Sequence, residues 1–339
     1  MSKIKTSILR PTPANLRRAA AALRRGELVA IPTETVYGLA ANALDGRACR
    51  KIFWAKKRPA NDPLIVHVLD LKQANALAEI NPAAVKLAKE FWPGPLTLVL
   101  PRKDTVSDVV TSGRDSVAVR SPVHALARRV LRLTGLPLAA PSANLFGYIS
   151  PTTAEHVRDG LDGRIKIILD GGACEVGVES TIVDLREPAR PRILRPGAIS
   201  AREISRVLGC VVRAGGSRVS SRPIGEVIGA VAPGLLESHY RPRTPLELVT
   251  KWTAGSLRGA PENSAFIRFG KPAGAVRAKA EFWLSRRGGA PEAARNLYAV
   301  LRAADEGGFA RIFVEAAPVL LGPFAGAIND RLRRAAAKR

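Results

Sequence analysis

Short apolar runs alternate with amphipathic stretches through the first 210 residues, and this alternation limits the possible folds more than any other feature. Residues 14–25 carry apolar side chains at helical spacing and are followed by the apolar run Leu28–Ile31. Repeated alternation of this kind predicts an α/β fold with a largely buried sheet, parallel or mixed. Further strands are expected at 64–68, 96–100, 116–120, 138–140, 165–169 and 181–185, and further helices at 46–57, 71–79, 82–91, 124–133 and 153–159.

The periodicity fades after residue 210 and then returns, which predicts two domains. Residues 211–244 are rich in turn-forming Gly, Pro and Ser, which is typical of a segment that joins domains. A connection of this length is expected to be either disordered or functional. Strands expected at 246–249, 265–269 and 311–315 predict a second, smaller α/β unit. We therefore predict a first domain at 1–210, a linker at 211–244 and a second domain at 245–339.

The chain is strongly basic. Its 53 Lys and Arg residues outnumber its 29 Asp and Glu residues, for a net charge of +24, and such a charge favours a nucleic acid, a nucleotide or a membrane surface as partner. The excess is spread along the chain, however, and a composition rich in Arg and Ala also produces it. No apolar run is long enough to span a membrane and no signal peptide opens the chain, which predicts a soluble, cytoplasmic protein.

Several standard enzyme classes are disfavoured by missing motifs. The sequence has no G-x-x-x-x-G-K-[ST] loop, no G-x-G-x-x-G fingerprint, no G-x-S-x-G elbow and no H-E-x-x-H helix. Its three cysteines and four histidines are not spaced as metal ligands. Standard ATPases, dehydrogenases, esterases and zinc enzymes are therefore disfavoured, and no metal site held by the protein is predicted.

Polar residues cluster where the expected strands end, which is where ligands bind in open α/β sheets. Pro32–Leu39 follows the first apolar strand, and Pro141–Asn144 follows another. Lys56–Pro59 ends a helix, where the dipole alone attracts cations, yet the Arg58 side chain also has the bidentate fork that suits a phosphate or a carboxylate. Arg120 closes an apolar strand and is expected to bind a ligand or to form an ion pair.

Taken in order, these and other motifs resemble the YrdC-like domain of threonylcarbamoyl-AMP synthases. The matching segments are Pro32–Leu39, Lys56–Leu64, Trp92–Thr97, Pro141–Asn144, Ser150–Thr152, Gly177–Asp184 and Leu194–Gly197. The segment Ala232–Pro242 and the ending Asn296–Leu332 resemble the long, two-domain form of that family. The resemblance implies a twisted mixed sheet with helices, followed by a smaller Rossmann-like α/β domain, with the linker folded over the nucleotide as a lid.

The resemblance also implies a reaction. L-Threonine, bicarbonate or CO2, and ATP would give L-threonylcarbamoyladenylate and pyrophosphate, the first step toward threonylcarbamoyladenosine beside the tRNA anticodon. The protein would be a nucleotidyltransferase that uses ATP as a substrate together with Mg2+. Because a carbamate oxygen attacks the α-phosphate, positioning and charge neutralisation would dominate catalysis. The product would pass to a threonylcarbamoyl-transferase complex; a direct tRNA contact is left open, and no membrane is involved.

Site residues carry over position by position. Those expected around threonine are Thr35, His67, Arg120, Ala140 and Ser180. Those expected on ATP are Lys56, Arg58, Asp62, Ser116, Ser142, Asn144, Ser150, Arg195 and Tyr240, with Lys56 and Arg58 as the catalytic pair and Tyr240 in the lid. On its own, His67 in an apolar strand is more often a core histidine. Leu145 and Phe146 are less polar than the family pattern, which changes the lip of the expected ATP site.

Two other functions fit parts of the sequence. A basic RNA-binding module without catalysis would account for the charge, but the aromatic residues that usually stack on RNA bases make up only 5% of the chain. A YrdC-like carbamoyltransferase of metallocentre assembly would bring extra domains and paired cysteines, which this sequence lacks. Pyrophosphate release that depends on threonine distinguishes the synthase from both, whereas salt-sensitive tRNA binding alone supports the RNA-binding module.

Overall fold

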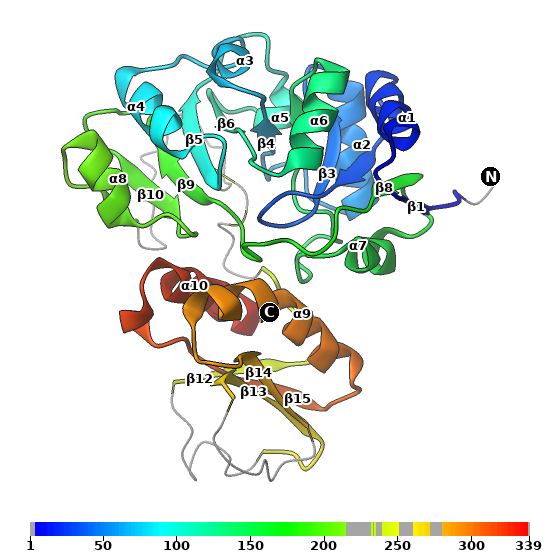
Figure 1. Cartoon of the computed structure of the whole chain (residues 1–339), viewed down its shortest axis with the longest axis vertical. Coiled ribbons are helices and arrows are strands. Elements are labelled where there is room, and N and C mark those ends of the chain that lie inside the picture. Colours follow the sequence, from blue (N-terminus) through cyan, green and yellow to red (C-terminus); the bar gives the residue numbers. More distant parts are fainter. Residues whose placement is uncertain are drawn as a thin grey trace.

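The computed structural model describes residues 4–214, 232, 234, 239–250, 260–271 and 280–337, which form two sheets with their helices (Figure 1). We call the described residues up to 214 the first unit and those from 239 onwards the second unit. Most of the predicted linker 211–244 lies outside the described residues. Helices α9 (Ala290–Glu306) and α10 (Pro323–Ala336) lie between the second sheet and the first unit (Figure 1).

The first unit contains a mixed sheet, as predicted, with the strand order β1-β8-β2-β3-β7-β4-β6-β5-β9-β10-β11. Its neighbours include parallel pairs such as β4 with β6 and antiparallel pairs such as β5 with β6. The strands are β1 (Ser7–Leu9), β2 (Val29–Ile31), β3 (Gly38–Asn42), β4 (Ile65–His67), β5 (Leu96–Pro101), β6 (Ser116–Arg120), β7 (Leu138–Ala139), β8 (Ile167–Leu169), β9 (Thr181–Asp184), β10 (Arg192–Arg195) and β11 (Arg213–Ala214). The helices are α1 (Pro13–Arg24), α2 (Gly46–Lys56), α3 (Leu71–Asn75), α4 (Pro82–Phe91), α5 (Asp108–Thr111), α6 (Ala125–Thr134), α7 (Ala154–Leu161) and α8 (Ala201–Leu208).

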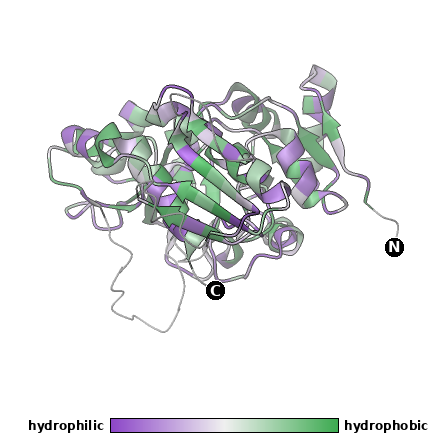
Figure 2. Ribbon diagram, turned by 90° about the horizontal axis from the view of Figure 1, so that it is seen from below, coloured by the Kyte–Doolittle hydropathy of each residue, from purple (hydrophilic) through white to green (hydrophobic). Residues whose placement is uncertain are grey.

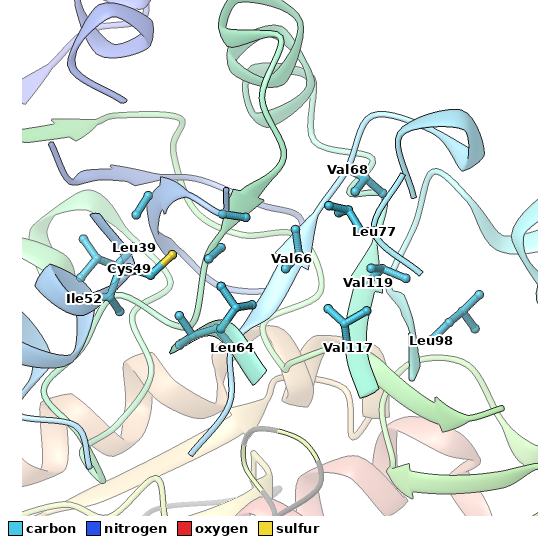
Figure 3. Packing of buried hydrophobic residues seen from close by; sticks show 14 of the residues in the cluster. Leu39, Cys49, Ile52, Leu64, Val66, Val68, Leu77, Leu98, Val117 and Val119 are labelled. Atoms are coloured by element: carbon cyan, nitrogen blue, oxygen red, sulfur yellow. The ribbon is translucent and has the colours of Figure 1, made fainter. Parts of the chain in front are cut away.

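The core of the first unit follows from strand alternation. Val29 and Ile31 of β2 pack with helices α1 and α6, whereas Leu28 and Ala30 belong to the cluster on the other side. Consecutive side chains of a strand point to opposite faces of the sheet, so a strand whose residues are all apolar is buried on both faces. In that second cluster, Cys49 of α2 lies close to Leu39 of β3 (Figure 3). The helices carry both hydrophilic and hydrophobic segments (Figure 2), as amphipathic covering layers require.

The second unit contains a smaller sheet in the order β12-β15-β13-β14. Its strands are β12 (Leu246–Val249), β13 (Ser264–Gly270), β14 (Glu281–Ser285) and β15 (Arg311–Glu315), and every neighbouring pair is parallel. A short 3-10 helix, η1 (Val319–Leu321), precedes α10. The all-parallel order of these strands, with α9 between β14 and β15, confirms the smaller Rossmann-like α/β fold that was expected.

Some elements differ from the sequence prediction for reasons outside the local pattern. The helix expected at 71–79 ends at Asn75, because Ala78 forms a β-bridge with Arg102 and the Glu79 N–H donates to the Pro101 carbonyl (2.9 Å). Strand β3 was not among the expected strands, and its first two residues end the polar segment Pro32–Leu39. It pairs with β2 after a bend in which the Thr33 hydroxyl donates to the Val36 carbonyl (2.6 Å).

The two units share packing across a close interface. Val36, Ile149 and Val178 of the first unit belong to the same apolar cluster as Leu297 and Leu301 of α9. Polar contacts reinforce it, because the Arg302 guanidinium donates to the Ile149 carbonyl (2.6 Å) and the Tyr148 hydroxyl donates to Asp305 (2.7 Å). The second unit therefore packs directly on loops of the first.

Gly177 tests this interface. Its φ is +77°, and a Cβ there would lie 2.4 Å from the Arg295 Cα of α9, whereas Gly172 has a φ of +76° and no atom that its Cβ would meet within 4 Å. Gly172→Ala is expected to cost about 1–2 kcal/mol of unfolding free energy from the backbone conformation alone. Gly177→Ala is expected to cost at least 1 kcal/mol more, since the α9 backbone must also move. Denaturant titration of both variants measures this difference, and equal costs would contradict the interface.

Candidate functional site

Residues from several strands and turns line one cavity of about 40 Å3. Ile65 and His67 of β4 both line it, and alternate residues share a strand face, so the cavity runs along a face of the sheet. Several lining residues lie at strand ends as expected, including His67, Arg120 and Arg195, but in a mixed sheet the carboxyl ends of the strands do not share one edge. The predicted residues that line the cavity are Thr35, Arg58, His67, Arg120, Ala140, Ser142, Ser180, Arg195 and Tyr240.

One wall of the cavity is built around Arg120, the last residue of β6. Its guanidinium pairs with Glu34 (2.6 Å) and donates to the Thr35 hydroxyl (2.9 Å) and the Gly94 carbonyl (3.3 Å). The Arg120 and Glu34 side chains are only 5% and 3% exposed. Such a buried, tethered guanidinium is held in one orientation, which suits recognition of a planar carboxylate.

His67 lies beside Arg120, because β4 and β6 pair in parallel with these two residues in register. Burial, and to a lesser extent the charge of Arg120, lowers the pKa of His67 to about 3, so the ring is neutral. Neither ring nitrogen has a hydrogen-bond partner among the described residues. On the strand next to β6, Thr97 is in register with Arg120, and its hydroxyl lies 2.7 Å from the Ser180 hydroxyl, which also accepts from Arg195 (3.1 Å). This part of the cavity is therefore lined by the neutral His67 ring and by the hydrogen-bonded Ser180 hydroxyl.

The other wall is cationic and is set by the end of α2. Asp45 caps this helix at its start, accepting from the Arg47 N–H (2.8 Å), and Lys57 ends it in the left-handed conformation with φ 52°. Because the chain reverses there, Lys56 and Arg58 are buried and Lys57 is exposed. Arg58 pairs with Asp62 (2.9 Å) and donates to the Pro63 carbonyl (2.7 Å).

Several predicted residues lie behind the cavity lining and support it. Lys56 donates to the carbonyls of Ser142 and Asn144, and its burial, followed by the charge of Arg58, lowers its pKa well below the ordinary value. The Asn144 amide donates to the carbonyls of Leu145 and Tyr148 (both 2.8 Å). Of the remaining members, Asp62 pairs with Arg58, Ser150 donates to Glu179 (2.7 Å), and Ser116 begins β6, at the end away from Arg120.

Tyr240 closes the cavity from outside the sheet and is 1% exposed. Its ring stacks on Tyr298 of α9 (5.8 Å between centroids) and lies under the Arg331 guanidinium of α10 (5.6 Å). Phe146, the apolar departure noted above, stands edge-on to His239 (5.9 Å) and under Arg58 (5.9 Å). The second unit and the lip of the cavity thus meet at Tyr240.

Three cavity residues with polar side chains were not predicted from the sequence: Thr33, Glu179 and His239. Thr33 and His239 lie in segments that were singled out, next to predicted residues, so those motifs were the available signal. Glu179 likewise lies in the segment Gly177–Asp184, next to Ser180, but its partners Tyr298 and Arg331 are 119 and 152 residues away in the chain. No local pattern indicates such a contact. Among the described residues, no group of three or more His, Cys, Asp or Glu side chains is arranged to hold a metal ion.

The fold and the site define an α/β protein in which an arginine-lined cavity on a mixed sheet is closed off by a second, parallel-sheet unit. A family model described as "Telomere recombination" matches residues 21–197, and one described as "Threonylcarbamoyl-AMP synthase, C-terminal domain" matches residues 199–337. The chain belongs to the threonylcarbamoyl-AMP synthase family.

Named relatives support this membership. The threonylcarbamoyl-AMP synthase of Pyrococcus abyssi is 42% identical over 96% of this chain and 94% of its own length. That of Bacillus subtilis is 48% identical over 69% of this chain and 66% of its own. The crystal structure of P. abyssi Sua5 complexed with L-threonine matches 98% of both chains with a TM-score of 0.86 and 40% identity.

Proposed function

We propose that this chain synthesises L-threonylcarbamoyladenylate from L-threonine, bicarbonate or CO2, and ATP, with release of pyrophosphate, and is therefore a nucleotidyltransferase. The observation that carries the proposal is that one cavity is lined both by a tethered guanidinium, Arg120, and by two further arginines, Arg58 and Arg195. An amino-acid carboxylate and a polyphosphate each need such a group, and the reaction requires both substrates at one place.

Threonine is assigned to the Arg120 side. Its carboxylate would bind the guanidinium, and its side-chain hydroxyl would bind among Thr35 and Ser180, with His67 and Ala140 closing the subsite. The neutral His67 ring supports this assignment, because it can accept or donate one hydrogen bond without adding charge beside Arg120. The L-threonine complex of the P. abyssi relative agrees with a threonine subsite in this fold.

ATP is assigned to the other side of the cavity. Arg58 and Arg195 would neutralise the phosphates and Ser142 would bind them from the loop after β7. Asn144 would shape this part of the nucleotide site through its bonds to the Leu145 and Tyr148 carbonyls, and Lys56 would hold the loop through its two carbonyl contacts. Asp62 orients Arg58, while Ser116, Ser150 and Tyr240 complete the proposed nucleotide site. The threonine nitrogen forms a bond to the carbon of CO2, a carbamate oxygen then attacks the α-phosphorus, and the bond to pyrophosphate breaks, so the protein supplies orientation and positive charge.

Magnesium is assigned to the substrate and not to the protein. The carboxylates nearest the cavity are each paired with an arginine: Glu34 with Arg120 (2.6 Å), Asp62 with Arg58 (2.9 Å) and Glu179 with Arg331 (2.9 Å). Mg2+ prefers carboxylate oxygens together with substrate phosphates. It would therefore enter bound to ATP.

The linker is proposed to act as a lid. The cavity of about 40 Å3 has room for a few water molecules only, so a nucleotide enters only if Tyr240 and its neighbours move outward. The two separate sheets, one ending at residue 214 and one beginning at residue 246, support the proposed division into a catalytic domain (1–210), a linker (211–244) and a second domain (245–339). None of the helices in the described ranges is long and apolar enough to cross a membrane. A cytoplasmic location, transfer of the product to a threonylcarbamoyl-transferase complex and a contact with tRNA stay predictions.

Pyrophosphate release tests the proposed function. Wild-type protein with MgATP, L-threonine and bicarbonate is expected to release pyrophosphate and to form a product with the mass of threonylcarbamoyl-AMP. Omitting any one substrate is expected to abolish release, because the carbamate that attacks ATP needs both other components. Release without threonine would contradict the proposal, as would folded protein that binds tRNA but forms no product.

A further inference from the structure

The carboxylate of Glu179 is held by both units although it lies next to the proposed active-site residue Ser180. It is 6% exposed and accepts from the Ser150 hydroxyl (2.7 Å), the Tyr298 hydroxyl of α9 (2.9 Å) and the Arg331 guanidinium of α10 (2.9 Å). The first donor belongs to the proposed ATP site, and the other two come from the second unit. The orientation of this carboxylate is therefore set jointly by the two units.

Arg331 also fixes the backbone on which two site residues stand. It donates to the carbonyls of Pro196 (2.6 Å) and Glu179 (3.3 Å), which are the chain neighbours of Arg195 and Ser180. Arg195 in turn donates to the Ser180 carbonyl (3.1 Å) and hydroxyl (3.1 Å). The fully buried Arg331 side chain of the second unit therefore holds in place the segments that carry Ser180 and Arg195.

The charge of Glu179 depends on the same contacts. Burial alone would raise its pKa, but the charges of Arg331 and Arg195 and the hydrogen bond from Ser150 hold the pKa at about 2. The titratable or charged groups that face it are Arg331 and Asp330 on α10, Tyr298 on α9, Arg195 on β10, and His239 and Tyr240 before β12. Among these groups, Arg331 is the largest influence that keeps Glu179 ionised.

We propose that Glu179 is a positioning residue for adenylate formation and that the second unit controls it through Tyr298 and Arg331. Glu179 orients the Ser150 hydroxyl for the nucleotide, while Arg331 sets the spacing between Ser180 and Arg195. The second unit thereby completes the active site, in addition to anchoring the lid. This inference rests on the proposed function, because Ser150, Ser180 and Arg195 receive their roles from it.

Conservative variants test the positioning role. Tyr298→Phe removes the hydroxyl that donates to Glu179 and keeps the ring that stacks on Tyr240, and Glu179→Gln keeps the shape of the side chain without its charge. Each is expected to raise the KM for ATP or to lower kcat by about tenfold or more, since small displacements of binding groups are costly to catalysis. The matched control is Arg295→Gln, since Arg295 lies at the same interface but donates to the Glu175 carbonyl (2.9 Å). It is expected to leave both constants unchanged.

The pH profile separates this role from a merely structural one. Wild-type activity is expected to show no acid limb from Glu179, which stays ionised far below neutral pH. Arg331→Gln removes the positive charge that counteracts the effect of burial on Glu179, so the pKa of Glu179 is expected to rise. Activity of this variant is then expected to fall toward acid pH, as the Glu179 carboxylate takes up a proton. Combining Arg331→Gln with Glu179→Gln is expected to remove that limb, because residue 179 then carries no carboxylate that can take up a proton.

The outcomes distinguish this inference from the proposed function. An active wild type with Tyr298→Phe and Glu179→Gln variants that keep wild-type constants overturns the positioning role and leaves the proposed function standing. A folded wild type that forms no threonylcarbamoyl-AMP overturns the proposed function and this inference with it. If Arg331→Gln does not fold, Tyr298→Phe and Glu179→Gln decide the question, with circular dichroism and thermal melting as the check that both are folded.

Discussion

Replacing Arg58 by alanine is expected to reduce threonylcarbamoyl-AMP formation by about a thousandfold, the scale on which an arginine that stabilises phosphate charge contributes to phosphoryl chemistry. Arg58 lines the cavity at the end of α2 and is held there by Asp62 and the Pro63 carbonyl. Its loss removes positive charge from the side of the cavity that we assign to the phosphates. The rate of pyrophosphate release at saturating threonine and bicarbonate measures the effect.

Controls for this variant come from neighbouring residues. Alanine at 58 leaves the Asp62 carboxylate buried without its arginine, which costs about 3–5 kcal/mol of stability, so Arg58→Ala is also made together with Asp62→Asn. Lys57→Ala removes a charge from an exposed side chain next to Arg58 and is expected to keep full activity. Substantial activity in the double variant, or an equal loss in Lys57→Ala, would contradict the phosphate role of Arg58.

Arg120→Gln is expected to weaken L-threonine binding by about a hundredfold, since truncating one partner of a buried charge pair costs about 2–5 kcal/mol. The guanidinium is the proposed partner of the threonine carboxylate, and glutamine offers neither its charge nor its fork. Calorimetric titration with L-threonine measures the loss. ATP binding serves as the internal control, because Arg58 and Arg195 are untouched.

The buried Glu34 must be considered in the same experiment, because it loses its ion-pair partner in Arg120→Gln. Adding Glu34→Gln neutralises that carboxylate and restores charge balance. The double variant is expected to fold as the wild type and still to bind threonine weakly. Wild-type affinity for threonine in either variant would contradict the assignment of Arg120.

Local patterns predicted the elements whose packing is decided by their own residues. Helix α2 and strand β2 were found from the spacing of apolar residues that are indeed buried, such as Ile52 and Ile31. The motifs around Thr35, Arg58, Arg120 and Arg195 also indicated residues that the fold brings to one cavity. Each of these motifs can be found from the sequence separately, because each lies next to an element that its own apolar residues indicate.

Features that depend on distant pairing were not predicted. The sheet face that carries the cavity follows from the mixed strand order, which the spacing of apolar residues does not encode. The early end of α3 depends on a bridge between Ala78 and Arg102. Likewise, Glu179 gives no local signal of its pairing with Arg331, since burial of a carboxylate is decided by where another segment packs.

Because Lys57 has the left-handed conformation, the cationic wall depends on where Lys56 and Arg58 stand in the sequence and not only on the number of positive charges. Lys56 stands before this chain reversal and Arg58 after it, and both side chains are buried, while the Lys57 side chain is exposed to solvent. Inserting or deleting a single residue at this reversal would leave the net charge almost unchanged and yet point the wrong side chains inward. Engineered hybrids that exchange α2 between related enzymes must therefore join upstream of Asp45 or downstream of Pro63, so that the reversal is transferred intact.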